Sequence, residues 1–591
     1  MRRLIKIAFG TFPKLSLVAF LLIALGVALE LPLPLLTAYF IDKVLPSKNI
    51  GLLNMIGLGL TGFLVLNVGF GFINNYLNTL LSEKITMRYG LLSFKSYFDS
   101  YLVSSFSKSP GYWANRIQNE PQSIAQLFRV MIDILTQGLT LLVGLFFIFY
   151  FNSRIGLFIL LITPFYVWAL FVLGPRIRKQ NKTVKEERSK LAGFIEESVS
   201  AFETVKTLSL EGFRKNELER HWSNVVRENV KYAIVVSIGN LVATTIASVA
   251  PISVLWYGGY LVMAGNLTLG KLIGINKFLS YVFKPIASLM GINARIQDAK
   301  TSLERLDEII SLPKENWTGK EIEVKANADI AINNLTFSYS TEGREVSVFN
   351  GLNLIIPGGK VTAIVGESGC GKSTLLRLIT GLLKSDSGQI LIGGNDISNA
   401  SMSDLRRQVC LIPQDSHLFS GSLLYNIAVG VDERNIEQSL LDATGVSKLA
   451  NLASHDGPYS YSTYDIGSRG LRLSGGERQR VALARVLVRD PSILLMDEVT
   501  SEIDLETEME IVGKIVELRK GKTTVIVAHR LTAAMMADEI IVLSNGKAEE
   551  VGTHDELISN NRGLYYRLWR ASQGEGRKES SISEDVTKVI P

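Results

Sequence analysis

Long apolar runs fill the first half of the chain, and they constrain its fold more than any other feature. A helix needs about 20 apolar residues to cross a bilayer, where its backbone polar groups must pair within the segment. Hydrophobic residues make up 47% of the 591 residues, and they are concentrated before about residue 300. The pattern predicts six membrane-spanning helices, at about residues 15–40, 54–78, 134–151, 155–173, 232–262 and 268–292.

The first apolar run also fits a second interpretation. Residues 1–28 have the basic start and apolar centre of a signal peptide. The apolar stretch continues through residues 29–40 without a convincing small-residue cleavage site, and further spans follow it. We therefore interpret this run as the first span.

The connections between the spans indicate how the chain is oriented. Those after the first, third and fifth spans are short, whereas those after the second and fourth are long and charged. Thirteen Lys or Arg residues lie from Arg176 through Lys231, and Arg2, Arg3 and Lys6 precede the first span. The positive-inside rule then places both termini and both long connections in the cytoplasm. This topology accounts for the net charge of +6, so we expect no nucleic-acid partner.

The two long connections are predicted to be helical. Residues 83–103 and 185–208 mix charges with apolar side chains at helical spacing and contain no proline. Arms of about 25 residues would extend about 37 Å from the membrane. Residues 105–113 and 208–216 are the predicted contact points with the second half of the chain, and a solvated hairpin without such contacts is the alternative.

The sequence texture changes after the sixth span. A charged helix leads to a linker, and short β-rich runs then alternate with helical ones, which is typical of an α/β domain. The predicted fold class is multidomain, with an all-α six-helix transmembrane domain followed by an α/β domain. The predicted boundaries are 1–310 for the transmembrane domain, 311–328 for the linker, 329–570 for the α/β domain and 571–591 for a disordered tail.

The cysteines indicate the compartment in which the chain works. The chain has two cysteines, Cys370 and Cys410, and both lie in its polar second half. Their number and positions favour neither a disulfide framework nor a metal cluster, in keeping with a reducing compartment.

A glycine-rich segment predicts a nucleotide site. Residues 360–383 are expected to form a strand, a loop and a helix, with the spacing G-x-x-x-x-G-K-[ST] at 366–373. The glycines let the backbone N–H groups surround phosphates, and the helix start adds positive potential. Lys372 would reach the β- and γ-phosphates and Ser373 would ligate Mg²⁺, so ATP and Mg²⁺ are the expected cofactors. The context disfavours a chance glycine turn. The predicted binding loop comprises Gly366, Glu367, Ser368, Gly369, Cys370, Gly371, Lys372, Ser373 and Thr374.

Two later strands carry side chains suited to hydrolysis. An apolar strand ends in Asp497, expected to hold Mg²⁺ through water, and Glu498, expected to orient or deprotonate the attacking water. Another strand ends in His529, which is suited to a γ-phosphate contact. Each feature alone is common in surface turns or structural sites. Their order after the glycine loop is what favours a role in ATP hydrolysis.

These motifs make the second half resemble the nucleotide-binding domain of ABC transporters. "LSGGERQR", residues 473–480, matches that family's signature motif and is called the signature segment below. The six-span half resembles the transmembrane domain of ABC exporters, so the resemblance covers nearly the whole chain.

The resemblance implies further binding roles. Tyr339 would stack on adenine, and Gln414 would sense Mg²⁺ and contact the membrane domain. Asp504 falls at the D-loop, where "SEID" departs from the common "SALD". The signature residues expected to bind nucleotide are Ser474, Gly475, Gly476 and Glu477.

The signature segment also implies a second polypeptide. In the family this segment caps the γ-phosphate bound to the other subunit, and this chain carries one nucleotide-binding domain. The expected partner is therefore a second half-transporter chain, with a homodimer favoured and a heterodimer with a degenerate chain left open.

The resulting functional prediction is ATP-driven export, or flipping between leaflets, by alternating access. The expected substrate is amphipathic (a drug, a lipid or a peptide), and membrane lipid is the other expected partner. The expected location is a bacterial cytoplasmic membrane. A non-transporting regulator or ATP-gated channel is the alternative, whereas soluble ABC ATPases lack six spans and importers normally carry the membrane domain on a separate chain.

Three charged residues at membrane depth are candidates for the substrate cavity. Lys277 and Lys284 lie seven residues apart in the sixth span, hence on one helical face. A lysine near the bilayer centre costs about 2.5–3.5 kcal/mol on insertion scales, so it usually faces a cavity or a partner. The sequence leaves two interpretations open: a basic face for an anionic or amphipathic substrate, or pairing with Glu30 in the first span together with snorkelling.

Overall fold

The computed structural model describes residues 13–106, 108–341, 344–431, 441–442, 444–446, 464–499, 505–528 and 530–573. The chain divides into two compact units. The helical unit contains the residues up to Lys95 together with Gly111–Ser311. The sheet unit contains Ser96–Pro110 together with the chain from Leu312 onward. Residues 574–591 of the predicted tail lie outside the described residues.

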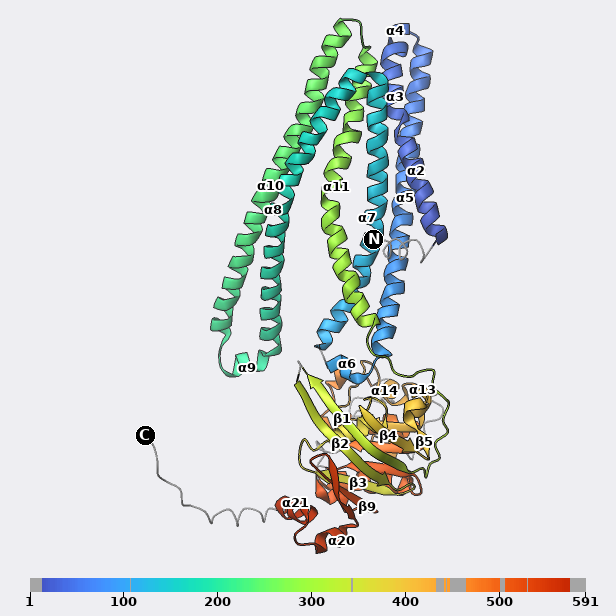
Figure 1. Ribbon diagram of the computed structural model, residues 1–591, viewed down its shortest axis with the longest axis vertical. Coiled ribbons are helices and arrows are strands. Elements are labelled where there is room, and N and C mark those ends of the chain that lie inside the picture. The colour runs from blue at the N-terminus through green and yellow to red at the C-terminus, as the bar shows by residue number, and fades with distance from the viewer. Residues whose placement is uncertain are drawn as a thin grey trace, which may run out of the picture. The chain divides into compact units, whose positions relative to one another are not determined.

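The helical unit consists of long helices joined by short turns (Figure 1). Its helices are α2 (Pro13–Glu30), α3 (Pro32–Tyr39), the π-helix η1 (Phe40–Val44), α4 (Leu45–Ser47), α5 (Ile50–Phe98), α7 (Pro110–Phe151), α8 (Ser153–Ser200), α9 (Phe202–Thr207), α10 (Glu211–Met263) and α11 (Leu269–Ile310). The last residues of α5 and the first of α7 belong to the sheet unit. The predicted helical connections are confirmed for most of their length, because α5 and α8 continue without a break from the apolar spans into the charged segments.

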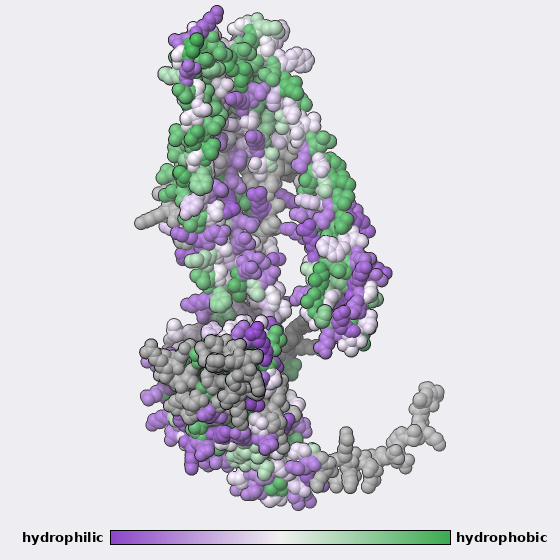
Figure 2. Space-filling model, turned by 180° about the vertical axis from the view of Figure 1, so that it is seen from behind, coloured by the Kyte–Doolittle hydropathy of each residue, from purple (hydrophilic) through white to green (hydrophobic). Residues whose placement is uncertain are grey.

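Five described helices are long and apolar enough to cross a membrane: α5, α7, α8, α10 and the segment Leu21–Ser47. Large apolar side chains such as Leu58, Phe72 and Trp256 are exposed on these helices, and Figure 2 shows hydrophobic residues over much of their surface. The sixth predicted span lies in α11, which is not among the five. Its first half carries Lys271, Lys277 and Lys284, which lower its apolar character.

The first span is broken in its middle. α2 ends at Glu30 and α3 begins at Pro32, and prolines stand at positions 32 and 34. A proline has no N–H, so Pro34 cannot donate to the Glu30 carbonyl four residues earlier. The Tyr281 hydroxyl of α11 donates to this carbonyl at 2.9 Å instead. The break therefore creates a polar site that a neighbouring helix satisfies.

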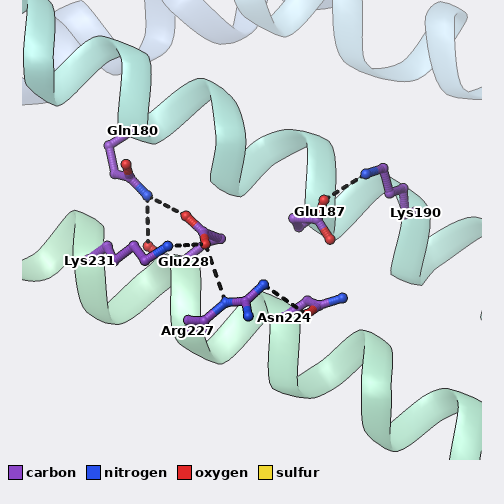
Figure 3. A network of polar contacts seen from close by, with 7 residues as sticks. All are labelled: Gln180, Glu187, Lys190, Asn224, Arg227, Glu228 and Lys231. Carbon is purple, nitrogen blue, oxygen red and sulfur yellow. Dashed lines mark hydrogen bonds and ion pairs between the residues drawn. The ribbon is translucent and has the colours of Figure 1, made fainter.

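Helices α8 and α10 pack side by side and are linked by a polar network around Glu228 (Figure 3). The Glu228 carboxylate accepts hydrogen bonds from Gln180 and Lys231, each at 2.7 Å, and Arg227 lies 3.5 Å away. Glu228 is buried, and a buried carboxylate left without partners would be costly. Gln180 comes from α8 and the other residues from α10, so the network fixes the register of the two helices.

The sheet unit is built on two sheets. The four-stranded sheet has the order β2-β1-β4-β5, and its strands pair antiparallel. The six-stranded sheet has the order β10-β9-β3-β8-β7-β6, with β9-β3-β8-β7-β6 paired in parallel. Strands β7 and β8 are buried throughout, as expected for a parallel sheet covered on both faces. The strands are β1 (Ile330–Thr341), β2 (Arg344–Ile356), β3 (Val361–Gly366), β4 (Ser387–Ile392), β5 (Asn395–Asp396), β6 (Val409–Ile412), β7 (Ile493–Asp497), β8 (Thr523–Val527), β9 (Glu539–Ser544) and β10 (Lys547–Gly552).

Short helices surround these sheets. They include α12 (Lys372–Ile379), α13 (Met402–Gln408), α14 (Leu423–Ala428), α17 (Gly475–Leu487), α18 (Leu505–Leu518), α19 (Leu531–Ala534), α20 (His554–Ser559) and α21 (Leu564–Ser572). The main apolar core joins β1, β2, β3 and α12. It places the loop between β3 and α12 at the carboxyl end of a buried parallel strand, where ligands bind in such sheets.

Candidate functional site

The glycine loop links β3 to α12, as the sequence predicts. Gly371 has a φ of 106°, in the left-handed region, and a Cβ there would lie 2.7 Å from the ring of Phe349. A Cβ at Gly366 would collide with the backbone oxygen of Leu543. Both positions therefore require glycine, and the loop can curl tightly at the start of α12.

Lys372 and Ser373, the two residues of α12 for which the sequence predicts a role, make hydrogen bonds that agree with those roles. The Lys372 ammonium donates to the carbonyls of Gly366 at 2.9 Å and Glu367 at 3.0 Å, so it lies folded over the loop. The Ser373 hydroxyl donates to the Asp497 carboxylate at 2.9 Å, although the two residues are 124 positions apart. Two oxygen groups expected to hold Mg²⁺ thus meet in space.

The environment of Asp497 favours a nearby cation. This carboxyl is 1% exposed, and burial raises its pKa, while the hydrogen bond from Ser373 opposes the rise. A divalent cation beside the carboxylate would offset the cost of burying its charge. The residues present therefore fit a Mg²⁺ ion, for which oxygen ligands are preferred.

Glu498 adopts an unusual backbone conformation next to Asp497. Its φ is 50°, in the left-handed region that non-glycine residues rarely adopt. Its carboxylate accepts a hydrogen bond of 2.9 Å from the Gln414 side chain. Both residues line a cavity of about 340 Å³. Strain of this kind is often found at functional sites, and here it aims a carboxylate into open space.

An ion pair that the sequence analysis did not identify lines the same cavity. Arg530 donates to Glu508 at 3.2 Å, and the Glu508 side chain is 5% exposed. Glu508 lies on α18 and Arg530 follows β8, so the pair joins two segments far apart in the sequence. The sequence signal available was an arginine directly after His529, with nothing to identify its partner.

The signature segment begins helix α17. Ser474 is the N-cap residue, and its hydroxyl accepts from the Glu477 backbone N–H at 3.4 Å. The Glu477 carboxylate accepts in return from the Ser474 N–H at 2.7 Å, which completes a capping box. Gly475 and Gly476 occupy the first turn of the helix. The start of α17 is thus an exposed helix N-terminus that already holds one carboxylate.

The glycine loop and the signature segment line different cavities. Glu367, Ser368, Gly369 and Cys370 line one of about 370 Å³. Gly475 lines another of about 410 Å³, together with Gln414, Asp415 and Arg478. The glycine loop and the start of α17 therefore open into separate cavities, and Gln414 lines the α17 cavity as well as the cavity beside Glu498.

Tyr339 lies beside the P-loop helix. Its hydroxyl is 3.2 Å from the Thr374 hydroxyl, and its half-buried ring packs edge to face on Phe337. Two other predicted site residues, His529 and Asp504, lie outside the described residues.

A short segment of the first long connection packs on the sheet unit to which it belongs. The Leu102 N–H donates to the Leu382 carbonyl at 3.1 Å, and the Glu315 N–H donates to the Asp99 carbonyl at 2.8 Å. Leu102 and Val103 pack against the main core. These contacts lie just before the predicted segment 105–113.

A buried ion pair fastens the linker beside this segment. Glu315 accepts two hydrogen bonds of 2.7 Å from Arg406, which also stacks over Trp317. The Glu315 side chain is 3% exposed, so breaking the pair would leave a buried charge. The second predicted contact, residues 208–216, comprises the turn after α9 and the start of α10 in the helical unit, and its contact with a sheet unit stays a prediction.

The charged residues at membrane depth are arranged around the break in the first span. The Lys277 ammonium donates to the Thr37 hydroxyl at 3.0 Å. The other two charged residues of this set are Glu30 and Lys284. All three charged side chains are exposed in the single chain. Within the described residues neither lysine forms an ion pair with Glu30, and the ammonium of Lys277 is instead bound to Thr37 of the first span.

Comparisons with known proteins agree with this architecture. Residues 16–286 match the family model of the ABC transporter transmembrane region, and residues 349–501 match that of the ABC transporter. The chain is similar to the alpha-hemolysin translocation ATP-binding protein HlyB of Escherichia coli, at 31% identity over 556 residues, 91% of this chain and 75% of that protein. It is also similar to the exotoxin translocation ATP-binding protein PaxB of Pasteurella aerogenes, at 31% identity over 547 residues, 90% of this chain and 74% of that protein.

A solved structure shows the same fold over the whole chain. The structure of a bacterial Atm1-family ABC exporter with ATP bound superimposes with a TM-score of 0.81 and 25% sequence identity. The match covers 95% of this chain and 98% of that chain. The predicted fold class, a helical transmembrane domain followed by an α/β ATPase domain, is confirmed.

Proposed function

This chain belongs to the ABC transporters, as a multi-pass integral membrane exporter whose ATP hydrolysis drives transport, and from this premise we propose that two chains join to complete two ATP sites. One observation carries the proposal. The glycine loop is connected to Asp497 and Glu498 through the hydrogen bond from Ser373 to Asp497, whereas Gly475 of the signature segment lines a cavity whose described lining includes no residue of the glycine loop. A second chain would bring its signature segment to the first chain's nucleotide. We favour a homodimer, because the P-loop, Asp497, Glu498 and the signature segment are all complete in this sequence.

The roles of the site residues follow from their positions. We assign phosphate binding to residues 366–374, and Mg²⁺ binding to Ser373, Asp497 and Gln414. The hydrogen bonds that link Ser373 to Asp497 and Gln414 to Glu498 support this grouping. Mg²⁺ would neutralise the phosphate charge when bound.

The proposed hydrolysis step depends on this chain's own residues. Glu498 accepts a proton from the attacking water, and Gln414 orients its carboxylate. Tyr339 stacks on the adenine, while His529 contacts the γ-phosphate and Asp504 acts across the dimer interface. Ser474, Gly475, Gly476 and the backbone N–H of Glu477 contact the γ-phosphate of the ATP bound to the partner chain.

A mixing experiment tests the shared sites. One variant, Lys372→Ala, has a defective P-loop, and another, Ser474→Arg, has a blocked signature segment. Each alone should lack ATPase activity, because both sites of its homodimer carry one defect. A mixed dimer has one site with both defects and one intact site. Equal mixing followed by reconstitution should restore about a quarter of the wild-type rate, since half of the dimers carry one intact site out of two. Mixing that restores no activity, with mixed dimers verified by differently tagged chains, would contradict shared sites.

We also propose the setting in which the exporter works. The transmembrane domain covers residues 1–310, the linker 311–328, the nucleotide-binding domain 329–570 and the tail 571–591. The basic cytoplasmic segments and the bacterial relatives support a bacterial cytoplasmic membrane. The proposed substrate is amphipathic, and the charged residues Lys277, Lys284 and Glu30 are its candidate contacts within the membrane.

A further inference from the structure

The cavity beside Glu498 has mainly apolar walls, which include Met496 and Ile526. Three charged side chains occur among its described lining residues: Glu498, Glu508 and Arg530. Charges in apolar surroundings interact more strongly with one another than they would in water. Two carboxylates therefore compete for one guanidinium in this cavity.

The structure shows which carboxylate holds Arg530. The guanidinium donates to Glu508 at 3.2 Å, whereas the Glu498 carboxylate accepts from the Gln414 side chain at 2.9 Å. Within the described part of the chain, no cation forms an ion pair with Glu498. A neutral amide donor leaves the charge of Glu498 in place, so this carboxylate remains able to accept a proton.

Burial explains why Arg530 pairs with Glu508. The Glu508 side chain is 5% exposed, while Glu498 is half-buried. Water partly solvates a half-buried carboxylate, whereas a buried one without a partner would be costly. The Arg530 side chain is 41% exposed, so packing leaves it room to turn if Glu508 no longer binds it.

An ion pair between Arg530 and Glu498 would oppose the proposed role of Glu498. A general base must take a proton from water, and its efficiency follows its proton affinity. A guanidinium beside a carboxylate stabilises the charged form and lowers that affinity about tenfold to a thousandfold. Glu498 is therefore the better base while Arg530 is bound elsewhere.

We infer that Glu508 is a positioning residue for ATP hydrolysis, which holds Arg530 and so keeps the Glu498 carboxylate free to accept a proton. This inference rests on the proposed role of Glu498 as the base. In the step concerned, the water oxygen bonds to the γ-phosphorus as the bond to ADP breaks, and the water proton goes to Glu498. Glu508 acts through Arg530 and needs no contact with the nucleotide.

A suppression experiment on the reconstituted full-length protein tests this role. Glu508→Gln removes the charge that holds Arg530, so Arg530 should turn to Glu498 and kcat should fall about tenfold. The KM for ATP should stay near its wild-type value, because neither Glu508 nor Arg530 is assigned to phosphate binding. Adding Arg530→Gln to the same chain removes the freed cation, so the double variant should recover most of the lost rate. Rates are expressed per ATP-binding site, titrated with a fluorescent ATP analogue.

The matched control is Glu315→Gln. It breaks another buried ion pair of the sheet unit, whose arginine, Arg406, lines a different cavity. Both Glu315→Gln and Glu508→Gln should lower the thermal unfolding temperature, because each leaves an arginine without its carboxylate. Only Glu508→Gln should lower kcat, since Arg406 does not share a cavity with Glu498.

Two results would overturn the role of Glu508. One is a wild-type kcat in Glu508→Gln, and the other is a double variant that stays as slow as Glu508→Gln, which would leave the pair a purely structural role. If Glu508→Gln does not fold, Glu508→Asp takes its place in the same comparison, because it withdraws the carboxylate by one methylene. The base itself is tested separately by Glu498→Gln, which leaves the pair intact, so loss of turnover in that variant retains the base whatever the double variant shows.

Discussion

Two helices of the sheet unit begin at glycine-rich segments that we propose to bind phosphate, yet their first turns differ. The N-cap of α12 is Gly371, which provides no side-chain hydrogen bond to the helix start. The N-cap of α17 is Ser474, and a capping box with Glu477 occupies the N–H groups of Ser474 and Glu477. The first N–H groups of any helix lack partners within the helix. The start of α12 is therefore left for a ligand, whereas a phosphate at α17 must share donors with the chain's own serine and glutamate.

This difference assigns unequal tasks to the two helix starts. The α12 start, with Lys372 folded over its loop, is suited to bind nucleotide in a single chain. The α17 start is suited to add a weaker contact once a second chain has closed over the nucleotide. Weak binding at the second start would make closure reversible, as a transport cycle requires.

The largest expected effect comes from keeping both helix starts and removing the proposed base. Glu498→Gln should reduce ATP hydrolysis at least about hundredfold, because general-base catalysis contributes that much. Both starts would keep their phosphate contacts, so ATP should accumulate in a closed dimer. Steady-state ATPase rates and ATP-dependent dimer formation measure the two effects. Turnover at the wild-type rate would remove Glu498 from the proposed mechanism.

Variants that block one helix start at a time should separate the loss of ATP binding from the loss of ATP hydrolysis. Lys372→Ala should weaken ATP binding by about tenfold or more, since it removes a charged donor to the phosphates. Ser474→Arg should leave ATP binding near the wild-type level while hydrolysis is lost, because the α17 start acts after closure. Equilibrium binding of a fluorescent ATP analogue under non-hydrolysing conditions gives the comparison. An equal loss of ATP binding in both variants would contradict the proposed difference between the two helix starts.

A thiol reagent can probe the α12 start alone. Cys370 lies half-buried in the glycine loop, whereas Cys410 is buried and burial raises its pKa. A higher pKa means less thiolate at neutral pH, so a maleimide should label Cys370 first. The added group should reduce ATPase activity about tenfold by obstructing the loop, and prior ATP binding should protect it. Cys370→Ser serves as the control, and unchanged hydrolysis after labelling confirmed by mass spectrometry would contradict this prediction.

The smallest expected effect concerns the capping box of α17. Glu477→Ala removes the carboxylate that accepts from the Ser474 N–H, and loss of such a cap costs about 1 kcal/mol. ATPase activity should fall less than in Ser474→Arg, because the start of α17 remains open to phosphate. Glu477→Gln keeps an acceptor and should behave like the wild type. If Glu477→Gln were as defective as Ser474→Arg, the charge of Glu477 would have a role beyond capping.

The sequence by itself determined the features that are local along the chain. The spacing from Gly366 to Ser373, the acids at the end of β7 and the serine before α17 can all be located by counting residues. The helical character of the long connections was equally visible, because hydrophobic periodicity does not depend on tertiary contacts. These features were sufficient to predict the fold class and the ATPase site.

Only the tertiary structure decided which distant groups meet. Ser373 reaches Asp497 and Gln414 reaches Glu498 across 124 and 84 positions, because the strands lie in the order β3-β8-β7-β6 and not in sequence order. The pairs Arg530–Glu508 and Arg406–Glu315 depend on the same folding. In the helical unit, the sequence did not predict that Lys277 donates to Thr37 of the first span, because this contact depends on how α11 packs against α3. Chain periodicity specifies the elements, whereas side-chain partners depend on how those elements pack.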